Sequence, residues 1–181
     1  GQDHVSFASV PDMRERTLVV GGFSKAFAMT GWRMGYLCGP RELVSHASAL
    51  HGYGIMSAPT VTQHAAIEAM EHGMADIAQM REEYNVRRQL LAQGLRDMGL
   101  RCSEPRGAFY CFPYIGDFGL SDMEFCHRLL QEEQVAIIPG SAFGVGGAGY
   151  ARVCYAADRE KIEEALRRMK RFLVRLREEK E

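Results

Sequence analysis

The sequence lacks several features that would assign it to other protein classes. No apolar run approaches the ~20 residues that a membrane-spanning helix needs. The first four residues have neither the basic start nor the apolar core of a secretion signal. The formal net charge of −1 gives no reason to expect nucleic acid or an anionic membrane as a partner. We therefore expect a cytoplasmic globular protein.

The cysteines and histidines give no pattern typical of disulfides or metal sites. The five cysteines are spread along the chain without a Cys-x-x-Cys pair. An odd number at irregular spacing indicates reduced thiols in a cytosolic protein. His64 and Glu68 lie one helical turn apart, but no third ligand follows at a spacing that suits a metal. A solvated helix face is the simpler interpretation, and we expect no metal site.

Before residue 100 the sequence predicts two short strands and three helices. Apolar β-prone runs that end at glycines indicate the strands. Pro40 is expected in the first turn of a helix, and Gly99 is a candidate C-terminal cap. The longest helix is expected where apolar residues recur at intervals of three, four or seven. The predicted ranges are strands at 17–20 and 32–38, a helix from 40, a loop at 52–59, and helices at 60–70 and about 75–98.

After residue 100 the pattern alternates between strands and helices. Ser121 and Glu124 form a capping box, in which each side chain satisfies a free backbone amide of the other residue. Asp158 is expected to cap the last helix. The predicted ranges are strands at 107–113, 135–138 and 150–156, and helices at 121–133 and from 158 onward. This order predicts a small α/β layer with its own core.

The predicted fold class is therefore α/β, with two parts. The first 75 residues hold too few elements to cover a sheet on both faces, so they resemble the end of a larger domain. We expect that part at 1–78. A long connecting helix and the small α/β domain are expected at 79–181.

Two cations, Lys25 and Arg33, stand eight positions apart in an otherwise apolar segment. A lysine amine attacks a carbonyl only after losing its proton, and its ordinary pKa of ~10.4 is too high for this near neutrality. A neighbouring cation and burial favour the neutral amine, and an arginine can grip a phosphate, with further donors from Ser24 and backbone amides. A bound phosphate would offset part of the effect of the cation, so the balance stays open. A surface lysine is the alternative, but residues 21–29 make a poor surface helix.

The segment from Ser24-Lys25 to Gly31-Trp32-Arg33-Met34-Gly35 resembles the cofactor motif of the pyridoxal-phosphate-dependent aminotransferases of fold type I, class I/II. The resemblance implies that Lys25 is the catalytic residue and forms a Schiff base with pyridoxal 5'-phosphate. It also implies that Ser24 and Arg33 bind the cofactor. Three later segments resemble family motifs in the same order, namely 107–113, the turn 139–144 and the strand 150–153. The implied fold is the C-terminal portion of the fold-type-I aminotransferase fold.

The later motifs imply residues that bind the substrate. Arg152 matches the arginine that clamps the α-carboxylate of the substrate, and an arginine among apolar strand residues is costly unless an anion meets it. A salt bridge or an exposed edge position is the alternative for Arg152. Phe143 is a second candidate contact, although packing in its turn explains it more simply. Tyr53 falls in the segment that in relatives reaches the site of the neighbouring subunit, which implies a homodimer.

The implied activity is amino-group transfer between an L-amino acid and a 2-oxo acid. Two departures from the family pattern affect this expectation. Gly22 stands where many relatives have a phosphate-binding serine. The N-terminal part of the relatives, which carries the aspartate partner of the pyridine nitrogen, is not among the 181 residues. We therefore expect the C-terminal part of a larger enzyme, inactive by itself. The alternative functions are a C–S lyase or synthase on the same fold, and the ligand-sensing domain of a transcription regulator.

Overall fold

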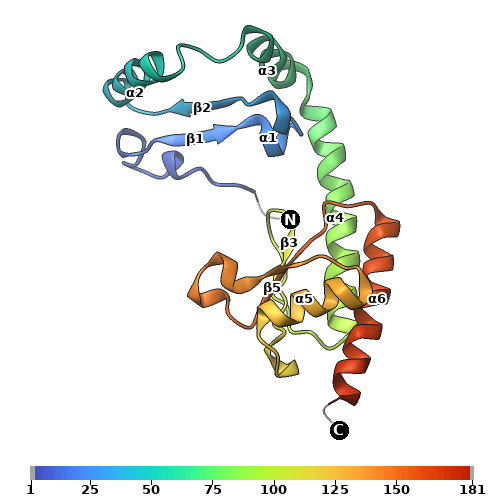
Figure 1. Ribbon diagram of the computed structural model, residues 1–181. Helices are drawn as coiled ribbons and strands as arrows, with labels where there is room; N and C mark the ends of the chain where they lie inside the picture. The colour runs from blue at the N-terminus through green and yellow to red at the C-terminus, as the bar shows by residue number, and fades with distance from the viewer. Residues whose placement is uncertain (1–2, 180–181) are drawn as a thin grey trace. The chain divides into compact units, whose positions relative to one another are not determined.

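The computed structural model describes residues 3–179, which divide into two compact units (Figure 1). The first unit ends at Gln79 and the second begins at Met80, within helix α4 (Met74–Asp97). The small sheets and the many helices make this a mixed α/β protein, as the sequence predicts. The outermost residues of the two predicted parts, 1, 2, 180 and 181, lie outside the described residues.

The first unit contains a two-stranded antiparallel sheet and short helices. Strand β1 pairs with β2 from Val19 opposite Cys38 to Gly22 opposite Gly35, and Figure 1 shows the two arrows side by side. Phe23, Met29 and Ala66 form a small buried core beside this sheet. The elements are η1 (Phe7–Ser9), η2 (Arg14–Arg16), β1 (Val19–Gly22), α1 (Phe23–Ala26), η3 (Thr30–Trp32), β2 (Gly35–Cys38), α2 (Arg41–Gly54) and α3 (Thr60–His72).

The boundaries of these elements differ from the predictions where glycines and turns intervene. Strand β1 continues through Gly21 and Gly22, because both glycines pair with β2. Strand β2 begins later than predicted, because Arg33 has a positive φ of 53° that ends the extended conformation. Helix α2 runs to Gly54, into the predicted loop. The helices predicted at 60–70 and 75–98 are confirmed as α3 and α4.

The second unit is a three-stranded antiparallel sheet packed against helices. Strand β5 lies between β3 and β4. Helix α6 runs beside α4, where the Arg177 side chain donates to the Met98 carbonyl at 2.8 Å, and it also contacts α5 (Figure 1). Side chains from β3, β5 and the three helices form one buried core. The elements after α4 are β3 (Tyr110–Cys111), η4 (Gly116–Phe118), α5 (Asp122–Glu133), β4 (Ile138–Pro139), η5 (Gly140–Phe143), η6 (Val145–Gly147), β5 (Ala151–Cys154) and α6 (Arg159–Glu178).

The helix ends of the second unit follow the sequence prediction closely, and the strands less so. The Ser121 hydroxyl accepts a hydrogen bond from the Glu124 amide at 3.1 Å, which confirms the predicted cap of α5. Gly99 has φ of +82°, as a C-terminal cap requires. Asp158 occupies the cap position of α6 but its side chain makes no capping hydrogen bond; it pairs with Lys161 instead, at 3.4 Å. All three strands are shorter than predicted, because only part of each apolar run pairs with a neighbouring strand.

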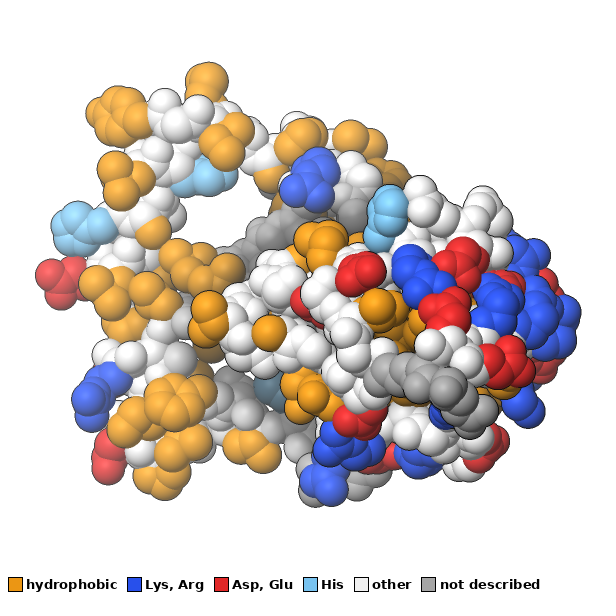
Figure 2. Space-filling view, turned by 60° about the horizontal axis from the view of Figure 1, so that its bottom comes forward, with side chains coloured by type: hydrophobic (Ala, Val, Ile, Leu, Met, Phe, Trp, Pro, Cys, Tyr) orange, Lys and Arg blue, Asp and Glu red, His pale blue; other side chains and the backbone are white. Residues whose placement is uncertain are grey.

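The surfaces of the two units differ in chemistry. The first unit exposes large apolar side chains, with Val20 at 80%, Met56 at 84% and Leu50 at 75% of their full exposure. Figure 2 shows many such side chains in orange on one face. The helices of the second unit carry ion pairs between basic and acidic side chains, which are interspersed in Figure 2. Among residues 3–179, no helix has the length and apolar character to span a bilayer, and no cluster of metal-ligating side chains occurs.

Glu133 at the end of α5 is expected to stabilise the second unit through its carboxylate. Its side chain is only 6% exposed and bonds Arg171 and Arg175, each at 2.7 Å. The pKa of Glu133 lies below its usual value of 4.5, chiefly because Arg175 donates a hydrogen bond, with a further contribution from Arg171 and partial opposition from burial. We expect Glu133→Gln to lower the unfolding free energy by about 1–2 kcal/mol at pH 7, since both arginines are partly exposed.

The pH dependence follows from the sign of that shift. A carboxyl whose pKa is lower in the folded state contributes stability above its unfolded pKa of ~4.3 and loses it as the pH falls through the folded value. The difference between the wild type and Glu133→Gln in urea unfolding should therefore shrink below about pH 4. Glu163→Gln, at an exposed position of α6, is the matched control and should change stability little. An equal effect of both variants would contradict the role of Glu133.

Candidate active site

The segment between β1 and β2 forms a closed loop that carries three of the predicted site residues. The Phe23 amide donates to the Met34 carbonyl at 3.1 Å and so joins the two ends of the loop. Phe23 and Met29 are buried and pack with Ala66 of α3. Their anchoring fixes α1, so Lys25 is presented on the exposed side of this short helix and Ser24 is half-buried.

Thr30 connects the two parts of the predicted cofactor motif. Its hydroxyl donates to the Ser24 carbonyl at 3.0 Å, and its own carbonyl accepts from Nη1 of Arg33 at 3.0 Å. Arg33 therefore has a fixed guanidinium on the same loop as Lys25. The sequence indicated Thr30 only as part of the motif. Its two hydrogen bonds were not predicted, although a threonine stands just before Gly-Trp-Arg in the motif.

Two residues of this loop hold unusual backbone conformations. Ala28 and Arg33 each have a φ of 53°, in the left-handed region that side chains other than glycine seldom adopt. Each such residue costs of order 1–3 kcal/mol and persists where surrounding contacts fix it, often at functional sites. The hydrogen bonds of Thr30 and the buried anchors Phe23 and Met29 are such contacts.

The donor set of the loop fits an aldehyde that carries a phosphate. Lys25 offers an amine for the carbonyl carbon, while Arg33 and the Ser24 hydroxyl offer donors for an anion. Gly22 adds no side-chain donor. A Cβ built on Gly22 would meet only the Met34 carbonyl, at 3.6 Å, which is an ordinary contact distance. The space around Gly22 would therefore accept the serine that many relatives have at this position.

Arg152 lies between two aromatic rings in the second unit. Its guanidinium carbon is 4.3 Å from the ring centre of Tyr110 and 4.5 Å from that of Phe143. The position in mid-strand is set by pairing, since Arg152 lies opposite Ile138. Within the described part of the chain, neither predicted alternative holds, because Arg152 is half-buried on the central strand and has no carboxylate as an ion-pair partner. Stacked rings leave the edge of the guanidinium available for a planar anion.

The ring of Tyr110 was not predicted as part of the site. The sequence placed Tyr110 in a strand of the family type but gave no reason to pair it with Arg152. The two residues meet because β3 and β5 are neighbours, with Tyr110 opposite Cys154. Phe143 also packs edge-on against Phe112, with ring centres 6.2 Å apart, so the predicted packing role and the contact with Arg152 coexist.

Gly140 fixes the turn that carries Phe143. A Cβ on Gly140 would lie 2.1 Å from the Gly147 carbonyl oxygen, closer than any real contact allows. We expect Gly140→Ala to displace this turn and to destabilise the second unit by about 1–3 kcal/mol. Gly146 has open space and an ordinary φ, so Gly146→Ala is the matched control with little effect. Thermal unfolding of both variants tests this, and equal midpoints would contradict it.

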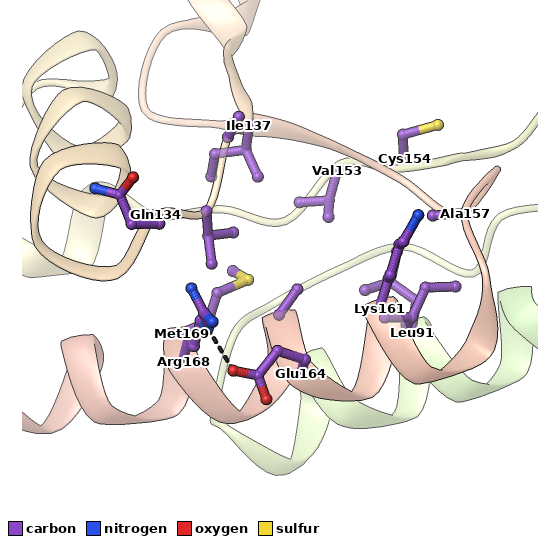
Figure 3. Close-up of a pocket in the computed structure, with 14 residues that line it drawn as sticks. Leu91, Gln134, Ile137, Val153, Cys154, Ala157, Lys161, Glu164, Arg168 and Met169 are labelled. Atoms are coloured by element: carbon purple, nitrogen blue, oxygen red, sulfur yellow. Dashed lines mark hydrogen bonds and ion pairs between the residues drawn. The ribbon is translucent and has the colours of Figure 1, made fainter.

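Tyr53 belongs to the first unit, and the second unit contains a cavity. Tyr53 lies in the last turn of α2, not in a loop, and is 94% exposed. A cavity of about 440 Å³ opens between β5, α6 and the segment after α5, and Figure 3 shows Ile137 and Val153 above Met169 and Leu91 in it. No residue predicted for the site lines this cavity. Its lining is mainly apolar, with an ion pair of Arg168 and Glu164 at the edge.

Comparisons with a family model and with known proteins agree on one family. The model of the family "Aminotransferase class I and II" matches residues 2–169. The chain is 45% identical over 172 residues to an aspartate aminotransferase of Pyrococcus abyssi, covering 94% of this chain and 44% of that protein. It is 44% identical over 175 residues to aromatic-amino-acid aminotransferase 2 of Thermococcus litoralis, covering 96% of this chain and 45% of that protein.

Solved structures agree with this result. The crystal structure of an aromatic aminotransferase from Pyrococcus horikoshii superposes with a TM-score of 0.92 at 43% identity, over 96% of this chain and 47% of that one. The chain thus spans a little under half the length of these relatives. The matched range contains both the loop of Lys25 and Arg33 and the strand of Arg152. The chain belongs to the aminotransferase class I and II family.

Proposed function

We propose that this chain forms part of an enzyme that transfers an amino group from an L-amino acid to a 2-oxo acid with pyridoxal 5'-phosphate as cofactor. The observation that carries the proposal is the closed loop from Phe23 to Met34, which holds Ser24, Lys25 and Arg33 together through Thr30. Membership of the family and aminotransferase relatives that are 45% and 38% identical to this chain support the same chemistry.

The residues of the loop divide the work between binding and proton transfer. When bound, the cofactor supplies an electrophilic aldehyde and an electron sink. Arg33 and Ser24 would hold its phosphate with charge-assisted and neutral hydrogen bonds. The Nζ of Lys25 would hold the aldehyde end of the cofactor and, as a free amine, would take the proton from the Cα of the amino acid as a general base. Thr30 is a positioning residue that keeps Arg33 in place.

Arg152 orients the substrate through its α-carboxylate. A carboxylate accepts two parallel hydrogen bonds from the guanidinium edge, which fixes the direction of the Cα–H bond. The rings of Tyr110 and Phe143 restrict the guanidinium before substrate binds. Phe143 is half-exposed, at 51%, and so remains accessible to a substrate side chain.

The exposed apolar side chains of the first unit support the proposal that other parts of a larger assembly bury them. Side chains such as Val20, Ile55 and Met56 are 70–84% exposed, which is costly for a surface in water. In the proposed enzyme, the part of the fold that the relatives have in addition covers β1 and β2. A second copy of the enzyme covers the end of α2 with Tyr53, so the proposed enzyme is a homodimer. Its proposed location is the cytoplasm.

Trapping of the cofactor by the chain tests this function directly. We would add pyridoxal 5'-phosphate to the purified chain, reduce with borohydride and map the labelled lysines by mass spectrometry. We expect the label at Lys25 in preference to Lys161 and Lys170, which serve as internal controls in the same molecule. Binding should be weak and transaminase activity negligible, because these residues span a little under half the length of the aminotransferase relatives.

Two variants sharpen this test. Arg33→Leu should reduce labelling at Lys25 without changing it at Lys161, because only the phosphate contact is lost. Arg41→Leu, at an exposed position at the start of α2, is the matched control and should leave labelling unchanged. Equal labelling of all lysines, unaffected by Arg33→Leu, would overturn the proposed cofactor site. A full-strength cofactor absorbance in the isolated chain would contradict the expected weakness of binding.

A further inference from the structure

Asp122, in the first turn of α5, is a buried carboxylate that no step of the proposed mechanism uses. Its residue is only 7% exposed, and its Oδ2 accepts a hydrogen bond from the backbone amide of Ser141 at 2.7 Å. Ser141 lies in η5, on the turn at 139–144 that also carries Phe143. The carboxylate therefore joins the start of α5 to a turn that contributes to the candidate site.

A carboxylate at this position could serve its own helix alone, because the free amides of a helix N-terminus attract negative charge. In α5, however, the Ser121 hydroxyl already accepts a hydrogen bond as the cap. The pKa of Asp122 lies below its ordinary value chiefly because the Ser141 amide donates to it, and the amides of Asp122 and Met123 contribute less. The main partner of Asp122 is thus the turn and not its own helix.

The turn that Asp122 holds determines where one of the two rings beside Arg152 lies. The Ser141 carbonyl accepts a hydrogen bond from the Gly144 amide at 3.1 Å, which closes the turn around Phe143. The ring centre of Phe143 lies 4.5 Å from the guanidinium carbon of Arg152. A movement of Ser141 away from α5 would therefore displace the ring that restricts this guanidinium.

We propose that Asp122 is a positioning residue, which holds the Phe143 ring against Arg152 and so orients the guanidinium for the carboxylate of the substrate. This inference rests on the proposed function of Arg152. It requires a hydrogen-bond acceptor for the Ser141 amide, so an asparagine, whose side-chain oxygen also accepts, can replace the carboxylate. An alanine cannot, because it leaves this amide without its acceptor.

The NMR signal of the Arg152 Nε–H group in the purified ¹⁵N-labelled chain tests the positioning, since a proton above the face of an aromatic ring resonates upfield. Its loss in Arg152→Leu assigns the signal, and Phe143→Leu should move it downfield. Asp122→Ala should move it in the same direction, whereas Asp122→Asn should keep most of the upfield shift. Ser121→Ala, which removes the cap of the same helix, is the matched control and should lower stability without moving the signal.

Three results would overturn the inference. One is an Arg152 signal that does not respond to Asp122→Ala, and another is an equal response to Ser121→Ala. The third is a signal that does not respond to Phe143→Leu, which decides the matter even if Asp122→Ala fails to fold.

Kinetics separate this inference from the proposed function. In an active enzyme made by joining this chain to the preceding part of a relative, Asp122→Ala should raise KM for the amino acid by about 10-fold, with a smaller change in kcat. KM for the decarboxylated amine should not change, and Asp122→Asn should restore KM for the amino acid. If Arg152→Leu raises this KM and Asp122→Ala does not, the inference alone fails. If Arg152→Leu leaves it unchanged, the proposed role of Arg152 fails as well.

Discussion

Replacing Lys25 with alanine is expected to reduce amino transfer by on the order of 10³-fold or more, because the change removes both the attaching amine and the general base. The measurement needs a complete site. A chimera that joins the preceding part of the Pyrococcus abyssi aspartate aminotransferase, 45% identical in the matched range, to this chain provides one. Its turnover with an amino acid and 2-oxoglutarate is compared before and after the substitution.

Lys161→Ala is the matched control for this prediction. Lys161 lies on α6 in the second unit and pairs with Asp158 at the surface, so turnover should not change. Unaltered turnover in the Lys25→Ala chimera would refute the proposed role of the amine. Release of ammonia or a thiol in place of transfer to 2-oxoglutarate would instead favour a lyase on the same fold.

Replacing Arg152 with leucine in the same chimera is expected to lower kcat/KM for the amino acid by roughly 30- to 1000-fold, which corresponds to about 2–4 kcal/mol for a lost charge-assisted contact. KM should rise strongly, because the carboxylate loses its main partner. Arg152→Lys should fall between, since an ammonium cannot make two parallel bonds. Steady-state kinetics with the amino acid and its decarboxylated amine distinguish carboxylate recognition from general damage.

Arg101→Leu is a demanding control for Arg152. Arg101 also stacks on an aromatic ring, with its guanidinium 4.4 Å from the centre of Tyr114, but it pairs with Asp117 at 3.1 Å. Its loss should leave kcat/KM unchanged. Equal losses in both variants would show that Arg152 acts through the stability of the unit and not through substrate.

The sequence was most informative where short-range rules decide the structure. Helices α3, α4 and α5 were predictable because periodicity and caps act within a few residues, as the Ser121–Glu124 cap illustrates. Strand lengths were not predictable to the same degree. Apolar runs such as 135–138 are only partly paired, because the pairing of β4 with β5 is limited to Ile138 and Pro139.

In the candidate site, too, local features were predictable and contacts between distant segments were not. The spacing of Lys25 and Arg33 could be read as a motif, since both stand in one short segment. The contacts of Arg152 with Tyr110 could not, because they depend on which strands become neighbours. The hydrogen bonds of Thr30 with Ser24 and Arg33 are local, but residue spacing alone does not show which groups they join.

Among residues 3–179, the sheet of the first unit has only two strands, each with one edge that pairs with no other strand. Two-stranded sheets are marginally stable in water unless further surfaces cover them. In the isolated chain, the amide protons of β1 and β2 should therefore exchange with deuterium through frequent local opening. The amides around Leu95, which is fully buried, should exchange only when the whole second unit opens. Slow exchange at Val19 to Gly22 would then report that a further surface covers the sheet.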